Sequence, residues 1–213
     1  MKIEELFEMP EFIDKEMPVV MSGTMRFYSE DTIKRDFDSI GKVKVNDEEV
    51  WSILKKDKSF AVIGILSVRK EDKKIGLNLI GKLEFKSKLD LSYDEEILTS
   101  KNVLQVDVVE VYSKEKANGF GYNLYLSLVE YGFVLISDHT QYIGGRKLWE
   151  KLARFSGDKF DVYVIDNGNV ILDDSGSPLK YDGKNITDEK IWKTPAKSAK
   201  DSTRYVLLAM KKK

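Results

Sequence analysis

Apolar and polar positions along the first half of the chain follow the spacing of strands. Phe60–Arg69 and Ile75–Phe85 are apolar runs joined by a short polar turn, which predicts an antiparallel hairpin. Val103–Tyr112 is a third run of this kind, and Met25–Tyr28 is a candidate first strand. We therefore expect a largely antiparallel sheet in this part of the chain.

One segment before the hairpin has the spacing of a helix instead. Asn46 is followed three residues later by Glu49, which is the spacing of a capping box. Val50, Ile53 and Leu54 then fall on one helical face. The pattern predicts a helix that starts near residue 46.

Two further helices are predicted, each directly after a strand. Tyr122–Tyr131 has a narrow polar stripe of Asn123, Ser127 and Glu130, so we expect a largely buried helix that ends at Gly132. The second unit is a strand at 133–137 followed by a helix at 144–152 and beyond. Its apolar face contains Leu148, Leu152 and Phe155.

The C-terminal part predicts more strands. Asp161–Ile165 and Val170–Asp173 flank Asn167-Gly168, a strong hairpin signal. Tyr205–Met210 is apolar throughout and reads as a closing strand. This order of elements predicts an α/β (α+β) fold with a mixed, mostly antiparallel central sheet and flanking helices.

We expect a single domain over residues 1–213, since this length can bury a core of its own. Residues 1–42 are an N-terminal lead-in, irregular or short helical over residues 1–20. Residues 43–172 are the core, 173–202 a loop or insertion, and 203–213 the closing strand with a basic tail.

Composition removes several classes of function. The chain has no cysteine and one histidine, which excludes disulfides, thiolate metal sites and multi-histidine metal sites. Lys and Arg number 35 against 36 Asp and Glu, so the overall charge does not favour nucleic acid as a partner. No apolar run is long enough to span a bilayer, and we expect a cytoplasmic protein with no membrane contact.

The loop Lys116-Ala-Asn-Gly-Phe-Gly-Tyr122 joins the strand at 103–112 to the helix that follows it. Glycines at a helix start let the backbone approach a phosphate closely, and the first turn offers unpaired N–H groups to it. The dinucleotide-binding and P-loop glycine patterns are both absent. The loop therefore predicts a phosphate-bearing ligand of another kind.

This segment resembles the GNAT superfamily of N-acetyltransferases, whose signature is Gln/Arg-x-x-Gly-x-Gly/Ala. Lys116 stands where the family usually has Gln or Arg. The resemblance covers roughly residues 43–172 and implies that acetyl-CoA or another acyl-CoA binds here. It implies that the backbone of Val109 and Val111 pairs with the pantetheine arm. The pyrophosphate would be held by the backbone amides of Asn118, Gly119, Phe120, Gly121 and Tyr122.

Acyl transfer to an amine needs a base and an acid. Asp107 and Glu110 on the strand at 103–112 are candidate bases, and the period of two predicts that they point to opposite faces. His139 is a third candidate because its ordinary pKa is near neutrality. Tyr142 is the candidate acid that protonates the leaving thiolate.

Three readings of function stay open. The first is an N-acyltransferase in which an unidentified amine attacks acyl-CoA directly; the absence of a cysteine nucleophile is consistent with it. The second is a catalytically silent GNAT-fold protein with a binding or structural role. The segment 137–149 resembles diverged GNAT-type proteins of tailed phages, which implies a place in the host cytoplasm or the virion. Nucleic-acid binding is the third reading.

Overall fold

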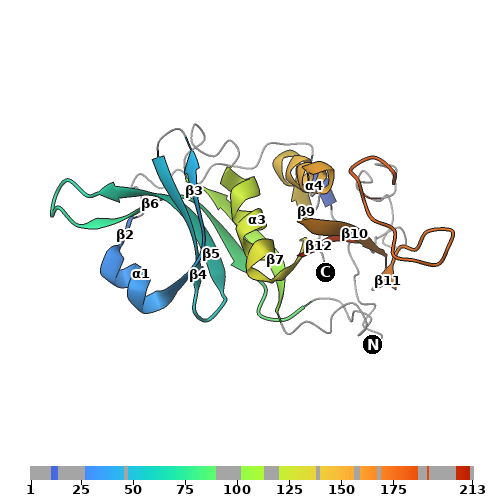
Figure 1. Ribbon diagram of the computed structural model, residues 1–213, viewed down its shortest axis with the longest axis horizontal. Coiled ribbons are helices and arrows are strands. Elements are labelled where there is room, and N and C mark those ends of the chain that lie inside the picture. Colours follow the sequence, from blue (N-terminus) through green and yellow to red (C-terminus); the bar gives the residue numbers. More distant parts are fainter. Residues whose placement is uncertain are drawn as a thin grey trace, which may run out of the picture. The chain divides into compact units, whose positions relative to one another are not determined.

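The computed structural model describes residues 11–13, 27–45, 48–89, 102–112, 120–137, 140–155, 159–166, 169–186, 191 and 205–211 (Figure 1). They form a mixed α/β structure with a mostly antiparallel sheet, which confirms the predicted class at this level. The chain divides into two compact units. We call residues 18–87 and 106–131 the hairpin unit, and residues 1–17, 88–105 and 132–213 the closing-strand unit. The prediction of a single domain stays a prediction.

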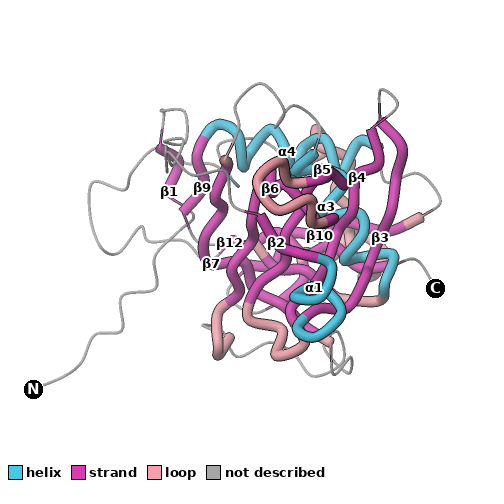
Figure 2. Tube along the Cα trace, turned by 90° about the vertical axis from the view of Figure 1, so that its left-hand side faces the viewer, coloured by secondary structure: helices cyan, strands magenta, loops and turns pink. Residues whose placement is uncertain are grey.

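The hairpin unit is built on an antiparallel sheet, drawn in magenta in Figure 2. Its strands are β2 (Phe27–Ser29), β3 (Phe37–Val45), β4 (Glu48–Lys55), β5 (Phe60–Val68), β6 (Ile75–Phe85) and residues 106–111 of β7 (Val103–Val111). They pair in the order β3-β4-β5-β6. On the other edge of β6, β2 pairs with residues 76–78 and β7 with residues 81–85. The predicted β5–β6 hairpin is confirmed.

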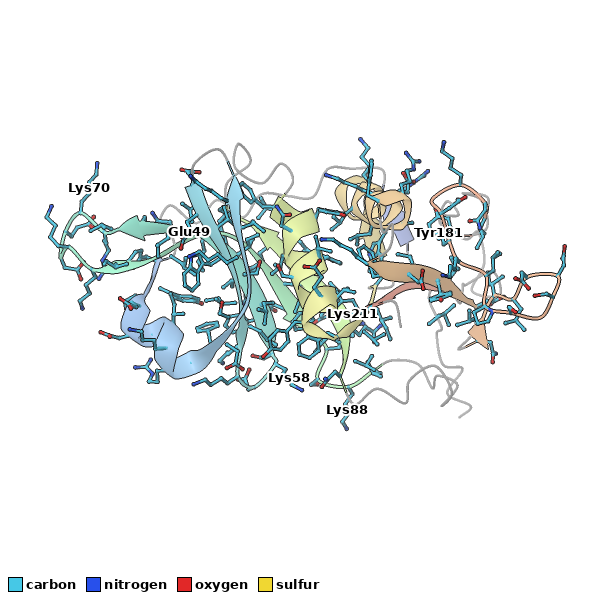
Figure 3. All side chains as sticks on the ribbon, viewed as in Figure 1. Glu49, Lys58, Lys70, Lys88, Tyr181 and Lys211 are labelled. Carbon is cyan, nitrogen blue, oxygen red and sulfur yellow. The ribbon has the colours of Figure 1, made fainter. Side chains whose placement is uncertain are left out.

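The helix predicted from Asn46 is wrong, because Glu48–Lys55 is a strand between β3 and β5. The carboxylate of Glu49 caps no helix. It accepts a hydrogen bond of 2.6 Å from the indole Nε1 of Trp51 and lies 2.7 Å from the ammonium of Lys42 (Figure 3). These hydrogen bonds, first that of Lys42 and then that of Trp51, lower the pKa of Glu49.

Two helices cover opposite faces of this sheet (Figure 1). Ile33 of α1 (Glu30–Asp36) packs on the apolar cluster that includes Ile53 of β4. Ser127 of α3 (Phe120–Tyr131) contacts Ser52, the preceding residue of the same strand. Because successive side chains of a strand point to opposite faces, the two helices lie on different sides. We call these sides the α1 face and the α3 face.

The α3 face is closely packed around Ser127. The sequence placed Ser127 in the polar stripe of this largely buried helix, and its side chain is buried. Its Oγ donates to the carbonyl of Asn123 at 2.8 Å and shares a hydrogen bond of 3.1 Å with the Oγ of Ser52. A Cβ at Gly41 of β3 would lie 2.3 Å from this Oγ, so the helix approaches the sheet closely only because residue 41 is glycine.

Gly132 ends α3 as predicted. Its φ of 109° lies in the left-handed region, which glycine enters without a steric penalty and which commonly ends helices. The chain then enters β8 (Val134–Ile136), whose three side chains are all buried.

The closing-strand unit has a second group of paired strands. Residues 103–105 of β7 pair in parallel with β8. Next comes β12 (Tyr205–Lys211), which lies between β8 and β10 (Phe160–Asp166), and β11 (Asn169–Val170) pairs with the far side of β10. The predicted closing strand is therefore confirmed, and it is a central strand. Asn167 and Gly168 lie outside the described residues.

One helix and a short two-stranded sheet complete this unit. In α4 (Ile143–Phe155), Leu152 is buried as predicted and Trp149 is buried beside it, but Phe155 is 65% exposed, so its placement on the buried face is wrong. β1 (Glu11–Ile13) pairs in parallel with β9 (Thr140–Tyr142) (Figure 2). Part of the expected irregular or helical lead-in is therefore a strand.

Residues 171–186 are packed within the closing-strand unit. The N–H of Leu179 donates to Ile171, and the N–H of Tyr181 donates to Val162 of β10, both at 2.8 Å. Tyr181 and Ile186 are buried. The described part of the expected loop or insertion thus extends the sheet through backbone hydrogen bonds.

Candidate functional site

The candidate site starts from the hydrogen-bonding direction of β7. The N–H of Tyr112, directly after β7, donates to the carbonyl of Ile80 in β6 at 2.8 Å, and Glu110 pairs with Lys82 of the same strand. Successive residues of a strand direct their backbone groups to alternate edges. The backbone N–H and C=O groups of Tyr112 and Glu110 point to β6. Those of Val109 and Val111 therefore point to the opposite edge of β7.

That opposite edge has a strand neighbour over only part of its length. β8 pairs with β7 at Val103, Leu104 and Gln105. From Val106 onward, no strand among the described residues pairs with this edge of β7. The backbone groups of Val109 and Val111, which the family resemblance implies for the pantetheine arm, therefore lie on an edge that could accept an extended ligand.

The start of α3 supplies the second part of the site. α3 begins at Phe120, which is buried, whereas Gly121 is exposed and Tyr122 is half-buried. The first turn contains no acidic residue, so nothing in it opposes an anion near the positive end of the helix dipole. Lys116, Asn118 and Gly119 lie outside the described residues.

Of the four candidate catalytic residues, Glu110 has the most defined surroundings. Its side chain is half-buried, and its Oε2 accepts a hydrogen bond of 2.5 Å from the hydroxyl of Tyr112. Asp107 is exposed where the register of β6 and β7 is irregular. His139 and the side chain of Tyr142 lie outside the described part of the chain.

The contact between Glu110 and Tyr112 was missed from the sequence, although a signal existed. Residues i and i+2 of a strand share a face, so a tyrosine two positions after a glutamate can reach its carboxylate. Tyr112 also packs against the cluster under α1, so both side chains lie on the α1 face. A phenol that is itself held by packing fixes the direction of this carboxylate.

A second polar group lies beside this pair on the same face. Lys82 stands directly across from Glu110 on β6, and directly opposite residues share a face. Its ammonium forms an ion pair with Glu84 and lies 4.7 Å from the centre of the Phe60 ring. The side chain of Lys82 is only 14% exposed. The α1 face at β6 and β7 therefore holds two carboxylates, one amine and one phenol.

Two other features of the described residues bear on function. No cluster of three side chains suited to bind a metal ion occurs among them. Within the same part of the chain, no helix combines the length and the apolar character that crossing a membrane requires.

The site therefore combines a strand edge with limited pairing, a helix start without acidic side chains, and a carboxylate held by a phenol. The strand edge and the helix start could together bind an extended ligand with an anionic end. The carboxylate could take a proton from a group beside that ligand. Comparison of the chain with protein-family models, with curated proteins and with solved structures finds no match in any of the three.

Proposed function

We propose that this chain is a GNAT-like N-acyltransferase, which transfers an acetyl or other acyl group from acyl-CoA to an amine by direct attack. The observation that carries the proposal is the edge of β7. Parallel pairing with β8 covers residues 103–105, and the backbone of Val109 and Val111 then points to an edge that no described strand occupies. An extended pantetheine arm has amide groups that suit such an edge.

The order of elements around β7 supports the same proposal. A hairpin precedes β7, α3 follows it, and β8 returns parallel to β7. The exposed Gly121 in the first turn of α3 leaves room for a phosphate near the helix start. Bound acyl-CoA would supply the thioester, which is the activated acyl donor.

The residues of the chain have simple roles in this proposal. The backbone of β7 orients the pantetheine arm, and the first turn of α3 binds the pyrophosphate. Glu110 takes a proton from the amine, directly or through water, and Tyr112 keeps its carboxylate in place. Asp107, His139 and Tyr142 remain predicted alternatives for proton transfer.

Thermal unfolding with CoA tests the binding step, because a ligand of the native state raises the melting temperature. At a concentration one hundred times Kd, the gain is about 2.7 kcal/mol. For a chain of this size we expect a rise of roughly 5–10 °C. The absence of any shift at millimolar CoA would exclude the proposal.

A charge reversal at the start of α3 sharpens the test. Gly121→Asp places a carboxylate where the pyrophosphate is expected, so the CoA-induced shift should disappear while the protein stays folded. Tyr131→Asp is a matched control, because Tyr131 is 54% exposed at the other end of the same helix. The control variant should keep the shift. If Gly121→Asp also keeps it, the phosphate site lies elsewhere.

A catalytically silent binding or structural protein is the second candidate, with a phage-related role among its forms. The observation in its favour is that the carboxylate of Glu110 already accepts a hydrogen bond from Tyr112. A CoA-induced shift without release of free CoA thiol over a panel of amines would favour this candidate. Release of thiol that depends on an amine would favour the transferase.

A further inference from the structure

β3 forms one edge of the sheet in the hairpin unit (Figure 2). It is nine residues long, and β4 pairs with one side of it from Phe37 to Val45. No strand among the described residues pairs with its other side, which we call the outer edge. The edge of a strand carries a row of backbone N–H and C=O groups, so a further strand can be added to it.

The direction of the backbone groups follows from one hydrogen bond. The N–H of Lys56, directly after β4, donates to the carbonyl of Asp36 at 3.0 Å. Successive residues of a strand direct their backbone groups to alternate edges, so every second residue of β4 counted back from Lys56 bonds to β3. Ser52 and Val50 belong to this series.

The partners of these two residues on β3 are Gly41 and Val43. The backbone groups of Gly41 and Val43 therefore point to β4. Lys42 and Lys44 alternate with them, so the N–H and C=O groups of both lysines point to the outer edge. An added strand would form its hydrogen bonds at these two residues.

The side chains at the outer edge alternate in charge. The side chain of Lys42 is 53% exposed, and its ammonium lies 5.0 Å from the centre of the Trp51 ring, which packs on the α1 face. Lys44 is exposed and shares this face, because it lies two residues further along the strand. Val43, between the two lysines, is 38% exposed on the α3 face. An added strand would therefore meet two amines on one face and an apolar side chain on the other.

These charges distinguish between possible partners. If two copies of β3 paired antiparallel about Val43, Lys42 of one copy would lie directly opposite Lys44 of the other. Like charges in this position destabilise a strand pair, and lysine on an edge strand commonly prevents self-association. Opposite charges in the same position stabilise the pair. The outer edge thus favours a strand with carboxylates over a second copy of the chain.

The existing ion pair of Lys42 leaves this preference in place. Its ammonium lies 2.7 Å from the carboxylate of Glu49, but an ammonium has three donors and can bond to a second carboxylate. Glu49 belongs to β4, one strand further from the outer edge. Lys42 and Lys44 are therefore the charges of these two strands that lie closest to an added strand.

We propose that the outer edge of β3 binds an extended acidic segment of a partner protein as an added antiparallel strand. Two acidic residues of the segment lie opposite Lys42 and Lys44, and the apolar residue between them lies opposite Val43. The N–H and C=O groups of the two acidic residues bond to the backbone of the two lysines. This inference concerns β3 alone and does not depend on the function proposed above.

Fluorescence anisotropy with a synthetic peptide tests this inference on the full chain. The probe is a labelled peptide of alternating glutamate and valine, and we expect it to bind in a saturable manner. A peptide in which lysine replaces glutamate should not bind, because its charges repel those of Lys42 and Lys44. Failure of the glutamate peptide to bind at about 1 mM would overturn the inference.

Two methylated peptides separate strand addition from simple attraction of charge. Both keep the sequence and the charge of the probe. Methyl groups on the amide nitrogens of the glutamates remove the donors that point to β3, so binding should be lost. Methyl groups on the amide nitrogens of the valines change only donors that point away from β3, so binding should be kept. Equal binding of the two peptides would refute strand addition.

A double charge reversal locates the site. Lys42→Glu with Lys44→Glu replaces two attractive pairs by repulsive ones and should weaken binding by about 10-fold. Lys70→Glu with Lys73→Glu is the matched control, because both lysines are exposed in the β5–β6 turn, where Figure 3 labels Lys70. The control should bind the probe as tightly as the wild type. Equal weakening in the two double variants would mean that only net charge matters, and the inference would fail.

Two other occupants of the outer edge are distinguished by competition. If single-stranded oligothymidylate displaces the peptide and binds more tightly, the edge is a site for nucleic acid and the inference is overturned. If the protein forms a dimer in sedimentation experiments and the peptide dissociates it, a second copy occupies the edge, and the inference is likewise overturned. We expect neither result.

Discussion

The two faces of the sheet in the hairpin unit differ in how completely a helix covers them. α3 buries six of its twelve residues against the sheet, whereas α1 buries none of its seven. The α3 face is closed by close contacts such as that of Gly41 with Ser127. The α1 face keeps half-buried polar groups, among them Glu110 and Tyr112. One face thus provides stability, and the other keeps polar groups near solvent.

The largest difference should appear when an apolar side chain is removed from each face. Leu128 of α3 is fully buried, and Leu128→Ala should cost about 2–5 kcal/mol because it removes apolar contacts and leaves a cavity. Ile33→Ala on α1 should cost about 1 kcal/mol, since Ile33 is only half-buried. Urea unfolding measures both free energies. Equal losses would mean that the two helices contribute equally to stability.

A smaller loss of stability is expected from Gly41→Ala, because the α3 face has no room for an added atom at this position. In Gly41→Ala, the new Cβ would lie 2.3 Å from the Oγ and 2.8 Å from the Cβ of Ser127. Relief of this overlap must displace α3 or β3 and should cost about 1–3 kcal/mol. In a double-mutant cycle, Ser127→Gly should cost less in the Gly41→Ala background than in the wild type. If the two losses in the free energy of unfolding are additive, residues 41 and 127 are not in contact.

The smallest effect concerns the β4–β5 turn, which belongs to neither face. Asp57 accepts hydrogen bonds from the hydroxyl of Ser59 at 2.5 Å and from its N–H at 2.9 Å. These bonds, that of the hydroxyl first, lower the pKa of Asp57 to about 2. Because the pKa is depressed in the folded state, this stabilisation is complete above the unfolded value of about 3.9 and is lost as the pH falls toward 2.

Asp57→Asn should therefore lower the melting temperature at pH 6 and have progressively less effect below pH 4. Asp38 is an exposed residue of β3, and Asp38→Asn controls for the loss of one negative charge. Thermal unfolding from pH 6 to pH 2.5 gives the comparison. A difference from wild type that stays constant over this range would show that ionised Asp57 does not hold the turn.

Elements whose structure depends on neighbouring residues could be predicted from the sequence. The strand β4, whose structure depends on pairing with other strands, could not. The β5–β6 hairpin follows from two apolar runs and a polar turn, and the end of α3 follows from Gly132. β4 has the spacing of a capping box, but its backbone is paired on both sides by β3 and β5. Apolar side chains at helical spacing suit a central strand equally well when both of its faces are covered.

Prediction of the site was limited in a similar way. Val109 and Val111 were expected to bind the ligand only because the segment resembles the GNAT superfamily, and Glu110 was a candidate base because it is a carboxylate on the same strand. The sequence did not reveal that Val109 and Val111 share the edge away from β6, since this depends on the register with β6. The cluster of Lys82, Glu84 and Phe60 comes from two other strands, and only strand pairing brings it to Glu110.

The central position of β12 has a consequence for the order in which the chain folds during synthesis. The described strands of the hairpin unit are all made once residue 111 has emerged, and α3 follows by residue 131. The closing-strand unit places residues 205–211 between β8 and β10. Until they emerge from the ribosome, β8 and β10 each lack a neighbour and expose an unpaired edge. We therefore expect a nascent chain with a folded hairpin unit, whose remaining part depends on chaperones until translation passes residue 211.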